Sequence, residues 1–295
     1  MRILLLGKNG QVGWELQRSL SILGEVMAFD RDSSPCGDLT QPRALMDAVS
    51  SLKPDVIVNA AAYTAVDQAE SEPLVVNTIN AEAPKALAQA AKAVGALLVQ
   101  YSTDYVFDGS GEKPWKESDA AAPLNAYGRS KRLAEEAIMS SGCSHLILRT
   151  SWVYGAKGSN FAKTMLRLAQ EKERLTVIDD QWGAPTSAEL LADVTAHAIR
   201  QCWLSPGLTG LYHVVAGGEA TWHGYASYVI GQAQKLAPEK KWMVKDIGAV
   251  PTSAFTTAAK RPANSRLDAT RFKQAFGLSL PQWQLGVDRL LNDIL

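Results

Sequence analysis

The sequence predicts an α/β protein with a Rossmann-type, doubly wound parallel sheet and a smaller, mixed α/β lobe. Two observations predict this fold. Over the first 150 residues, short apolar runs alternate with longer segments of helical periodicity, as in successive βαβ units. After Arg149 this alternation ends, and Gly, Pro and Trp interrupt segments of mixed type. We therefore expect one domain over residues 1–150 and a second lobe over 151–295, with some segments of the second returning to the first.

Five apolar runs are expected to form parallel strands that are covered on both faces: Met1 to Leu6, Glu25 to Phe29, Asp55 to Asn59, Ala96 to Tyr101 and His145 to Arg149. Between them we expect four helices, from about Val12 to Leu23, Arg43 to Leu52, Pro73 to Val94 and Ala126 to Ser140. A terminal helix should follow Pro281, because five apolar residues form one helical stripe there: Trp283, Val287, Leu290, Leu291 and Ile294.

Composition excludes several classes of function. Thirty basic residues balance thirty acidic ones, so the chain lacks the field that would hold nucleic acid or an anionic membrane. Cys36, Cys143 and Cys202 are widely spaced, which argues against a disulfide framework or a cysteine metal cluster. No apolar run approaches the roughly 18 residues of a membrane span, and the N-terminus lacks a signal-peptide pattern. We expect a cytoplasmic protein.

A glycine-rich loop follows the first expected strand. Gly7, Gly10 and Gly13 are spaced G-x-x-G-x-x-G, and the next helix begins within the loop. Such glycines let the backbone approach a pyrophosphate, whose charge is met by free N–H groups and the helix dipole. The glycines alone would also fit a tight turn that binds nothing.

An acidic residue after the second strand favours a dinucleotide. Asp30 can accept a hydrogen bond from an adenosine ribose 2′-hydroxyl, whereas Arg31 could neutralise a 2′-phosphate, so NADH and NADPH both remain open. Asp38 and Leu39 are placed to flank an adenine ring, although Asp38 also fits a solvated loop. We assign dinucleotide binding to residues 1–150 and mainly substrate binding to 151–295.

A tyrosine and a lysine lie four residues apart at the start of the fourth helix. Tyr127 and Lys131 should share one helical face, where the ammonium would lower the pKa of the phenol and fit it for proton transfer. The strand that ends at Tyr101 runs into the hydroxyl residues Ser102 and Thr103, at the edge where open α/β sheets bind ligands. We expect Tyr127, Lys131 and Thr103 to form a catalytic group.

These features resemble the extended short-chain dehydrogenase/reductase family over nearly the whole chain. The segments that carry the resemblance are Gly7 to Leu16, Asn59 to Asp67, Ser102 to Phe107, Arg149 to Gly155 and Asp180 to Thr186. The resemblance implies a cofactor site formed, besides the glycines, by Gln11, Val12, Asp30, Asp38, Leu39, Ala62, Tyr63, Thr64 and Tyr101. It also implies that Thr103, Asp104, Tyr127 and Trp152 contact a sugar nucleotide, with Tyr127 as the acid and Lys131 as its partner.

The implied reaction is reduction by NADPH or NADH of the C4 ketone of dTDP-4-dehydro-β-L-rhamnose to dTDP-L-rhamnose. This sugar would serve rhamnose-containing polysaccharides such as the O-antigen of lipopolysaccharide. The resemblance further implies a homodimer and a possible dependence on Mg²⁺. Glu15 is a conceivable ligand, but a lone glutamate on a helix is usually a solvated charge, so we assign no metal site.

Two alternatives remain. An epimerase or dehydratase could share this fold, since fold alone does not select the chemistry. The related dehydratases carry Thr-Asp-Glu at the strand end, whereas Tyr105 stands here in place of the glutamate. A non-catalytic regulatory subunit, like the relative that binds a methionine adenosyltransferase, is the second alternative, and the intact Tyr127 and Lys131 argue against it.

Overall fold

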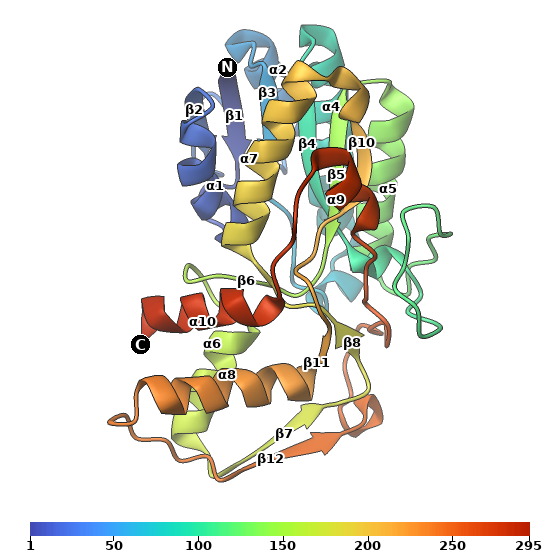
Figure 1. Ribbon diagram of the computed structural model, residues 1–295. Coiled ribbons are helices and arrows are strands. Elements are labelled where there is room, and N and C mark those ends of the chain that lie inside the picture. Colours follow the sequence, from blue (N-terminus) through green and yellow to red (C-terminus); the bar gives the residue numbers. More distant parts are fainter.

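A six-stranded parallel sheet organises the upper lobe of the molecule in Figure 1, a computed structural model that describes residues 1–295. The strands lie in the order β10-β5-β4-β3-β1-β2. Their bounds are β1 Arg2–Leu6, β2 Glu25–Phe29, β3 Val56–Asn59, β4 Leu97–Thr103, β5 His145–Thr150 and β10 Gly210–His213. Because all pairs are parallel, the carboxyl ends of the strands meet at one edge of the sheet.

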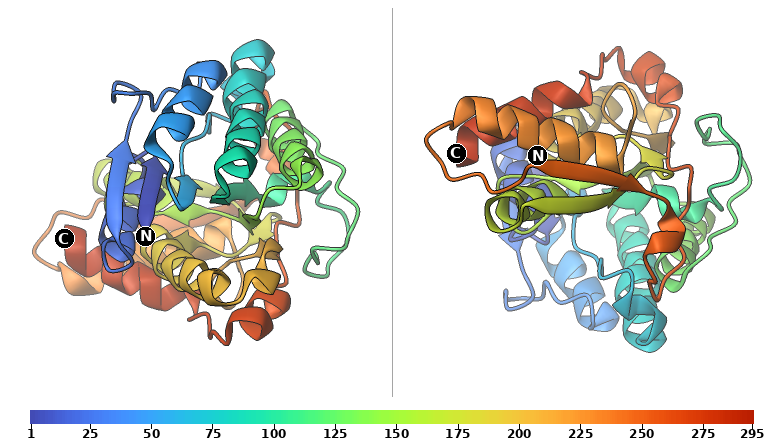
Figure 2. Two further views of the ribbon diagram at one scale, coloured as in Figure 1. Left: turned by 90° about the horizontal axis from the view of Figure 1, so that it is seen from above. Right: turned by 90° about the horizontal axis from the view of Figure 1, so that it is seen from below.

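Helices cover both faces of this sheet. One face packs against α1 (Gln11–Ser21), α7 (Ala188–Leu204) and α9 (Thr270–Phe276), and the other against α2 (Pro42–Leu52), α4 (Ala83–Val94) and α5 (Ala126–Ser141). The view from above in Figure 2 shows α2, α4 and α5 on one side of the sheet and α7 with α9 on the other. The near-continuous apolar strands follow from this double cover.

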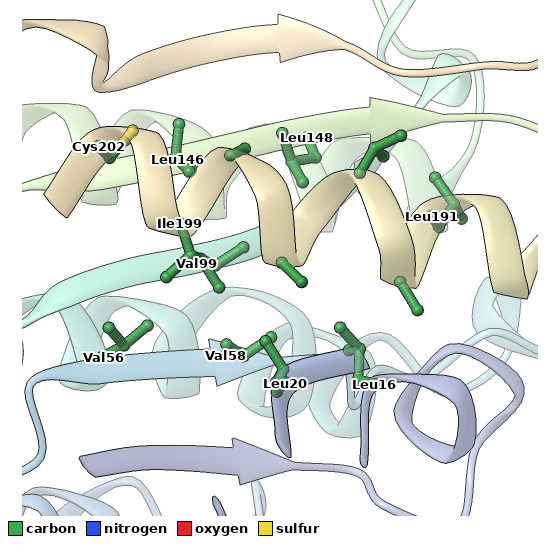
Figure 3. Close-up of a cluster of buried hydrophobic side chains, with 14 of the residues drawn as sticks. Leu16, Leu20, Val56, Val58, Val99, Leu146, Leu148, Leu191, Ile199 and Cys202 are labelled. Atoms are coloured by element: carbon green, nitrogen blue, oxygen red, sulfur yellow. The ribbon is translucent and has the colours of Figure 1, made fainter. Parts of the chain in front are cut away.

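The core between the sheet, α1 and α7 is formed by side chains that Figure 3 shows converging from both layers. Leu16 and Leu20 of α1 and Ile199 of α7 are fully buried, as are Val58 and Val99 of the strands that they face. Full burial of each such side chain contributes about 1.5–3 kcal/mol. The rigid core fixes the sheet edge at which the site lies.

Two elements differ from the expected pattern. The sheet has a sixth strand, β10, which pairs with β5 although it comes from the second half of the chain. The long helix expected from Pro73 to Val94 is divided into α3 (Pro73–Asn77), a π-helical turn (Thr78–Glu82) and α4. The turn carries the buried Asn80, whose side chain is hydrogen bonded to backbone and side-chain groups outside the helix.

The lower lobe packs around α6 (Phe161–Glu171), α8 (Trp222–Leu236) and α10 (Trp283–Ile294), as Figure 1 shows. Short strands complete it: β7 (Arg174–Ile178) pairs in parallel with β12 (Asp246–Val250), β6 (Val153–Tyr154) with β9 (Thr186–Ser187), and β8 (Trp182–Gly183) antiparallel with β11 (Ala220–Thr221). The stripe expected on the terminal helix is present, since Trp283, Val287, Leu290 and Leu291 are buried and Ile294 is partly buried.

None of the helices has the length and apolar character needed to cross a membrane. Cys36, Cys143 and Cys202 are free and buried.

Candidate active site

The glycine-rich loop joins β1 to α1 at the carboxyl edge of the sheet. Gly7 has φ +87°, a left-handed conformation that glycine adopts without strain. A Cβ atom at Gly13 would lie 2.0 Å from the Gly7 carbonyl oxygen, so only glycine allows the first turn of α1 to pack this closely on the loop. The loop backbone and the N-terminus of α1 are thereby presented to a ligand diphosphate.

Two cavities of about 470 and 210 Å³ meet at this loop and share Gly7, Asn9 and Gly10 among their lining residues. The larger cavity is lined by nine of the expected residues: Gly7, Gly10, Gln11, Val12, Ala62, Thr64, Tyr101, Tyr127 and Lys131. The smaller is lined by Asp30, Asp38, Leu39 and Tyr63, together with Arg31. Gly13 supports the loop and lines neither cavity. The structure therefore brings nearly all of the expected cofactor residues into one crevice.

Asp30 lines the smaller cavity among positive and polar groups. Hydrogen bonds from Ser33, and then from Lys8 and Asn9, hold its pKa below the usual value. The Nζ atom of Lys8 lies 3.3 Å from the Asp30 carboxylate, and Asn9 Nδ2 donates to it at 2.8 Å. With Arg31 also lining this cavity, the site contains both an acceptor for a ribose hydroxyl and cations for a 2′-phosphate.

Lys131 is buried on α5 and is anchored to the end of β4. Its Nζ atom donates to the Tyr101 carbonyl oxygen at 2.6 Å. Burial lowers the pKa of Lys131 to about 8, although the negative charge of Glu135 one turn away opposes this shift. An ammonium has three donors, so two remain free for a ligand in the cavity that Lys131 lines.

Tyr127 faces the same cavity, but the pKa of its phenol is not lowered as the sequence led us to expect. Burial, and then the charge of Asp104, raise it to about 12, and a hydrogen bond with Thr103 opposes the rise. The ammonium of Lys131 is held by a backbone carbonyl rather than by the phenol. Tyr127 is therefore a protonated phenol in this state, which suits it to donate a proton.

Thr103 and Asp104 follow β4 directly and are both buried. Thr103 Oγ1 donates to Asp104 Oδ1 at 3.0 Å, whereas Asp104 Oδ2 is buried without a hydrogen-bond partner. Burial raises the pKa of Asp104 to about 6, against hydrogen bonds from Ser265 and Thr103. Neither residue lines the larger cavity. An unpartnered buried carboxylate oxygen is a candidate acceptor for a ligand hydroxyl.

Asn80 connects the cofactor crevice to the catalytic helix, and sequence reasoning missed it. Its Oδ1 accepts from the backbone N–H of Tyr63 at 2.8 Å. Its Nδ2 donates to the Tyr63 carbonyl at 3.0 Å and to Ser130 Oγ at 3.1 Å. The π-helical turn directs Asn80 to these partners, and such turns often occur at functional sites. No local motif marks it.

A buried ion pair supports the site from behind. Arg149 donates through Nε and Nη2 to the two carboxylate oxygens of Glu135 at 2.8 and 2.7 Å. Ser102 Oγ donates to Glu135 at 2.6 Å, which ties α5 to the end of β4. Burial and the charge of Arg149 lower the pKa of His213 to about 3, so this histidine is neutral and structural.

A third cavity of about 430 Å³ lies in the lower lobe and was not expected. It is lined by Phe161, Met165, Leu168, Thr176, Val177, Ile178, Gln181, Trp222, Thr252, Phe255, Thr257 and Arg261. Arg261 is the only ionisable residue among them and is paired with Asp67 of the upper lobe, with an Nη2–Oδ2 distance of 2.6 Å. The apolar residues of α6 follow a helical period, and that spacing alone does not distinguish a cavity wall from a core.

Trp152 lies in the segment between Thr150 and Val153, both of which line the larger crevice cavity. Its indole stacks on that of Trp222, which lines the lower cavity, with ring centroids 3.6 Å apart. Trp152 itself lines neither cavity, but it contacts the lining of the lower one through Trp222.

Glu15, the conceivable Mg²⁺ ligand, lies on α1 beside other acidic groups. Burial and the charge of Glu189 raise its pKa, while Arg18, 3.8 Å away, opposes the shift. No group of three His, Cys, Asp or Glu side chains within the chain is arranged to hold a metal ion. The residues of one chain therefore do not fit the ion.

Comparison with known proteins agrees with this geometry. The dTDP-4-dehydrorhamnose reductase of Escherichia coli (strain K12) is 55% identical over 295 residues, which are 100% of this chain and 98% of the relative. A reductase of that name from Clostridium acetobutylicum superposes with a TM-score of 0.91 at 34% identity, covering 100% of this chain and 99% of the other. The Bacillus anthracis reductase, solved in complex with NADP, gives 0.87 at 34% identity and 99% coverage of both.

The family model of the RmlD substrate binding domain matches residues 1–295. The match covers the whole chain and therefore both lobes. The chain belongs to the RmlD substrate binding domain family.

Proposed function

We propose that the protein reduces the C4 ketone of dTDP-4-dehydro-β-L-rhamnose with NADPH or NADH and releases dTDP-L-rhamnose. The observation that carries this proposal is the position of Tyr127 and Lys131, which line the same cavity as the glycine-rich loop. A dinucleotide bound on that loop would extend toward a proton donor and a cation. The relatives with whole-length similarity are named for this reaction.

The reacting groups have separate tasks in this mechanism. A bound reduced nicotinamide supplies the hydride. Lys131 would hold the cofactor ribose with the donors that Tyr101 leaves free. Thr103 would donate to the ketone oxygen after its hydroxyl turns away from Asp104. Tyr127 donates its proton to that oxygen as negative charge develops on it. The buried phenol is protonated at neutral pH, so it can act without prior activation.

Net reduction is favoured over elimination by the residue that follows Asp104. Tyr105 packs edge-on against Tyr127, with ring centroids 5.8 Å apart. Burial, and then the charge of Asp104, raise its pKa above the ordinary value for a phenol. A phenol of this kind cannot serve as a base near neutral pH, so the position has no group to abstract a sugar C5 proton.

We propose further that the third cavity receives the thymidine nucleotide. Its apolar lining with a few polar groups is typical of a small-molecule site. Phe255 presents aromatic surface for a base, and Arg261 presents a guanidinium that fits a diphosphate. Trp152 and Trp222 join this cavity to the crevice, so one substrate could span both.

A coupled assay tests the proposed function. Purified protein is offered dTDP-4-dehydro-L-rhamnose with one equivalent of NADPH or NADH, and oxidation is followed at the nicotinamide absorbance. We expect stoichiometric loss of reduced cofactor, because an epimerase or dehydratase returns the hydride to the sugar and consumes none. No loss of cofactor, or a 4-keto-6-deoxy product formed from dTDP-glucose, would overturn the proposal.

The setting of this reaction is also a proposal. We place the enzyme in the cytoplasm, where three free buried thiols stay reduced, and expect a homodimer whose product feeds rhamnose-containing polysaccharides. Sedimentation of the purified protein tests the homodimer, which a monomeric mass across the micromolar range would contradict.

A further inference from the structure

Trp152 has an unusual backbone conformation for its size. Its φ is +49°, in the left-handed region that bulky residues rarely occupy. Such a conformation persists only where surrounding contacts hold it, and it often occurs at functional sites. The contacts that hold the Trp152 side chain therefore indicate which residues control its position.

Two contacts fix the indole of Trp152. Trp222 of α8 covers one face, with ring centroids 3.6 Å apart and planes inclined by only 13°. Gly183 of β8 lies against the ring edge, and a Cβ atom there would be 2.6 Å from Trp152 Cε2. Both contacts come from the lower lobe, although Trp152 directly follows the crevice residues of β5.

Trp222 is itself held in place. Its Nε1 donates to Gln181 Oε1 at 3.1 Å, and Gln181 Nε2 donates to Thr252 Oγ1 at 3.0 Å. The ring of Phe161 also packs against the Trp222 indole, with ring centroids 4.6 Å apart. These four residues all line the lower cavity, so a ligand there would contact the same group that holds Trp152.

From these contacts we infer that Trp222 is a positioning residue: it holds Trp152 against the sugar and couples nucleotide binding in the lower cavity to sugar placement in the crevice. This inference rests on the proposed function. Gly183 has a complementary role, because its missing side chain leaves the space that the Trp152 indole occupies. A misplacement of about 1 Å in a reacting group can cost about 10²-fold in rate, so a modest stacking contact can have a large kinetic effect.

A double-mutant cycle tests this inference. Trp222→Leu removes the stack, and we expect kcat to fall roughly 10- to 100-fold and KM for the dTDP-sugar to rise, with the affinity for NADPH unchanged. Trp222→Phe keeps an aromatic face and should restore most of the loss. In a Trp152→Leu background, Trp222→Leu should have much less effect, because a residue that acts through another is not additive with it.

Two further variants separate positioning from folding. Gly183→Ala keeps Trp222, but its added methyl group displaces the Trp152 indole. This variant should also lower kcat and raise KM for the dTDP-sugar without changing the affinity for NADPH. It therefore tests the inference even if Trp222→Leu folds poorly. Trp203→Leu changes a half-exposed tryptophan on α7 and should behave as wild type. Near-UV circular dichroism should lose the signal of the stacked pair in Trp222→Leu and not in Trp203→Leu.

The outcomes distinguish this inference from the function on which it rests. If the wild type does not reduce the dTDP-sugar, the proposed function is wrong. If the wild type does and Trp222→Leu has normal kcat and KM, or if its effect is the same with and without Trp152, the positioning role is wrong.

Discussion

The two lobes contribute to the active site in different ways. In the upper lobe, the site residues come from short segments at the ends of the parallel strands β1, β2, β3 and β4 and from the start of α5. In the lower lobe, the cavity is assembled from faces of α6 and α8, from β7 and from the loop before α9, across residues 161 to 261. Local sequence patterns therefore mark the residues of the upper half of the site. The lower half is formed by packing between elements, which no local pattern marks.

This difference has a physical origin. Parallel strands bring their carboxyl ends to one edge whichever residues come after them, so residues there share a site without any special contact. A cavity between helices depends on where core packing stops, and residues that line it have the same period as residues that fill a core. We therefore expect substitutions to separate the functions of the lobes. Substitutions in the upper lobe should alter the chemical step and the use of the cofactor, whereas substitutions in the lower lobe should alter binding of the sugar nucleotide.

The largest effect is expected for Tyr127→Phe in the upper lobe. Loss of the proton donor should lower kcat by roughly 10² to 10⁴, the usual contribution of a general acid, while NADPH affinity stays nearly constant. Steady-state kinetics and titration of NADPH fluorescence measure the two quantities.

Tyr228→Phe is the matched control, since it removes a phenol oxygen that bonds Asp288 in the lower lobe. Near-normal turnover by Tyr127→Phe would remove Tyr127 from the mechanism.

The parts of the site that were predictable from sequence are those that local geometry determines. The glycine spacing predicted the turn after β1, and the four-residue spacing placed Tyr127 and Lys131 in one cavity. The strand-end rule placed Thr103 within hydrogen-bond reach of Tyr127, although Thr103 does not line that cavity. Each of these predictions uses only the period of one helix or strand and the parallel order of the sheet.

Other parts depend on contacts between distant segments. The pKa of Tyr127 was expected to fall and instead rises, because burial and Asp104 outweigh an ammonium that is bound to the Tyr101 carbonyl. Asn80 acquires its role from a π-helical turn, and β10 joins the sheet from beyond residue 200. No periodicity in the sequence marks these features.

The second prediction concerns the pH dependence of the upper lobe. Burial lowers the pKa of Lys131 to about 8, and in the proposed mechanism the ammonium is the form that holds the cofactor ribose. Because burial disfavours the charged form, the proton is lost at a lower pH than in free lysine. kcat/KM for NADPH should therefore fall about tenfold for each pH unit above 8.

In Lys131→Met, kcat/KM for NADPH should no longer fall above pH 8. The KM for NADPH of this variant should be higher than that of the wild type at neutral pH. A wild-type profile that stays flat to pH 9.5 would contradict the role of the ammonium.

A third prediction addresses the lower lobe. Phe255 lines the nucleotide cavity and is 43% exposed, so Phe255→Ala should leave stability nearly unchanged. Stacking of a base on an aromatic ring contributes about 1–3 kcal/mol, which corresponds to roughly a fivefold or greater rise in KM for the dTDP-sugar. KM for NADPH should not change.

Leu236→Ala, at an exposed position at the end of α8 outside the cavity, is the control. Equal changes in both KM values for Phe255→Ala would show that the two lobes do not divide the ligands in this way.

The smallest effect is expected for cofactor choice within the upper lobe. Asp30 accepts from Asn9 and lies 3.3 Å from Lys8, and Arg31 lines the same cavity. These groups oppose one another, so the wild type should use NADH and NADPH within about tenfold in kcat/KM. Asp30→Ala frees Lys8 and removes the acceptor for a ribose hydroxyl. Exposed charge pairs contribute little, so the preference for NADPH should rise by only roughly two- to fivefold.

Asp32→Ala removes the same charge two residues away at an exposed position and should leave the ratio of kcat/KM for the two cofactors unchanged. Arg31→Ala should move the ratio in the opposite direction from Asp30→Ala, because it removes a cation available to the 2′-phosphate. If Asp30→Ala and Asp32→Ala move the ratio equally, net charge at the crevice mouth selects the cofactor and Asp30 has no specific role. If kcat/KM of the wild type differs between NADH and NADPH by three orders of magnitude, the effects of Asp30 and of the cations Lys8 and Arg31 do not balance as we expect.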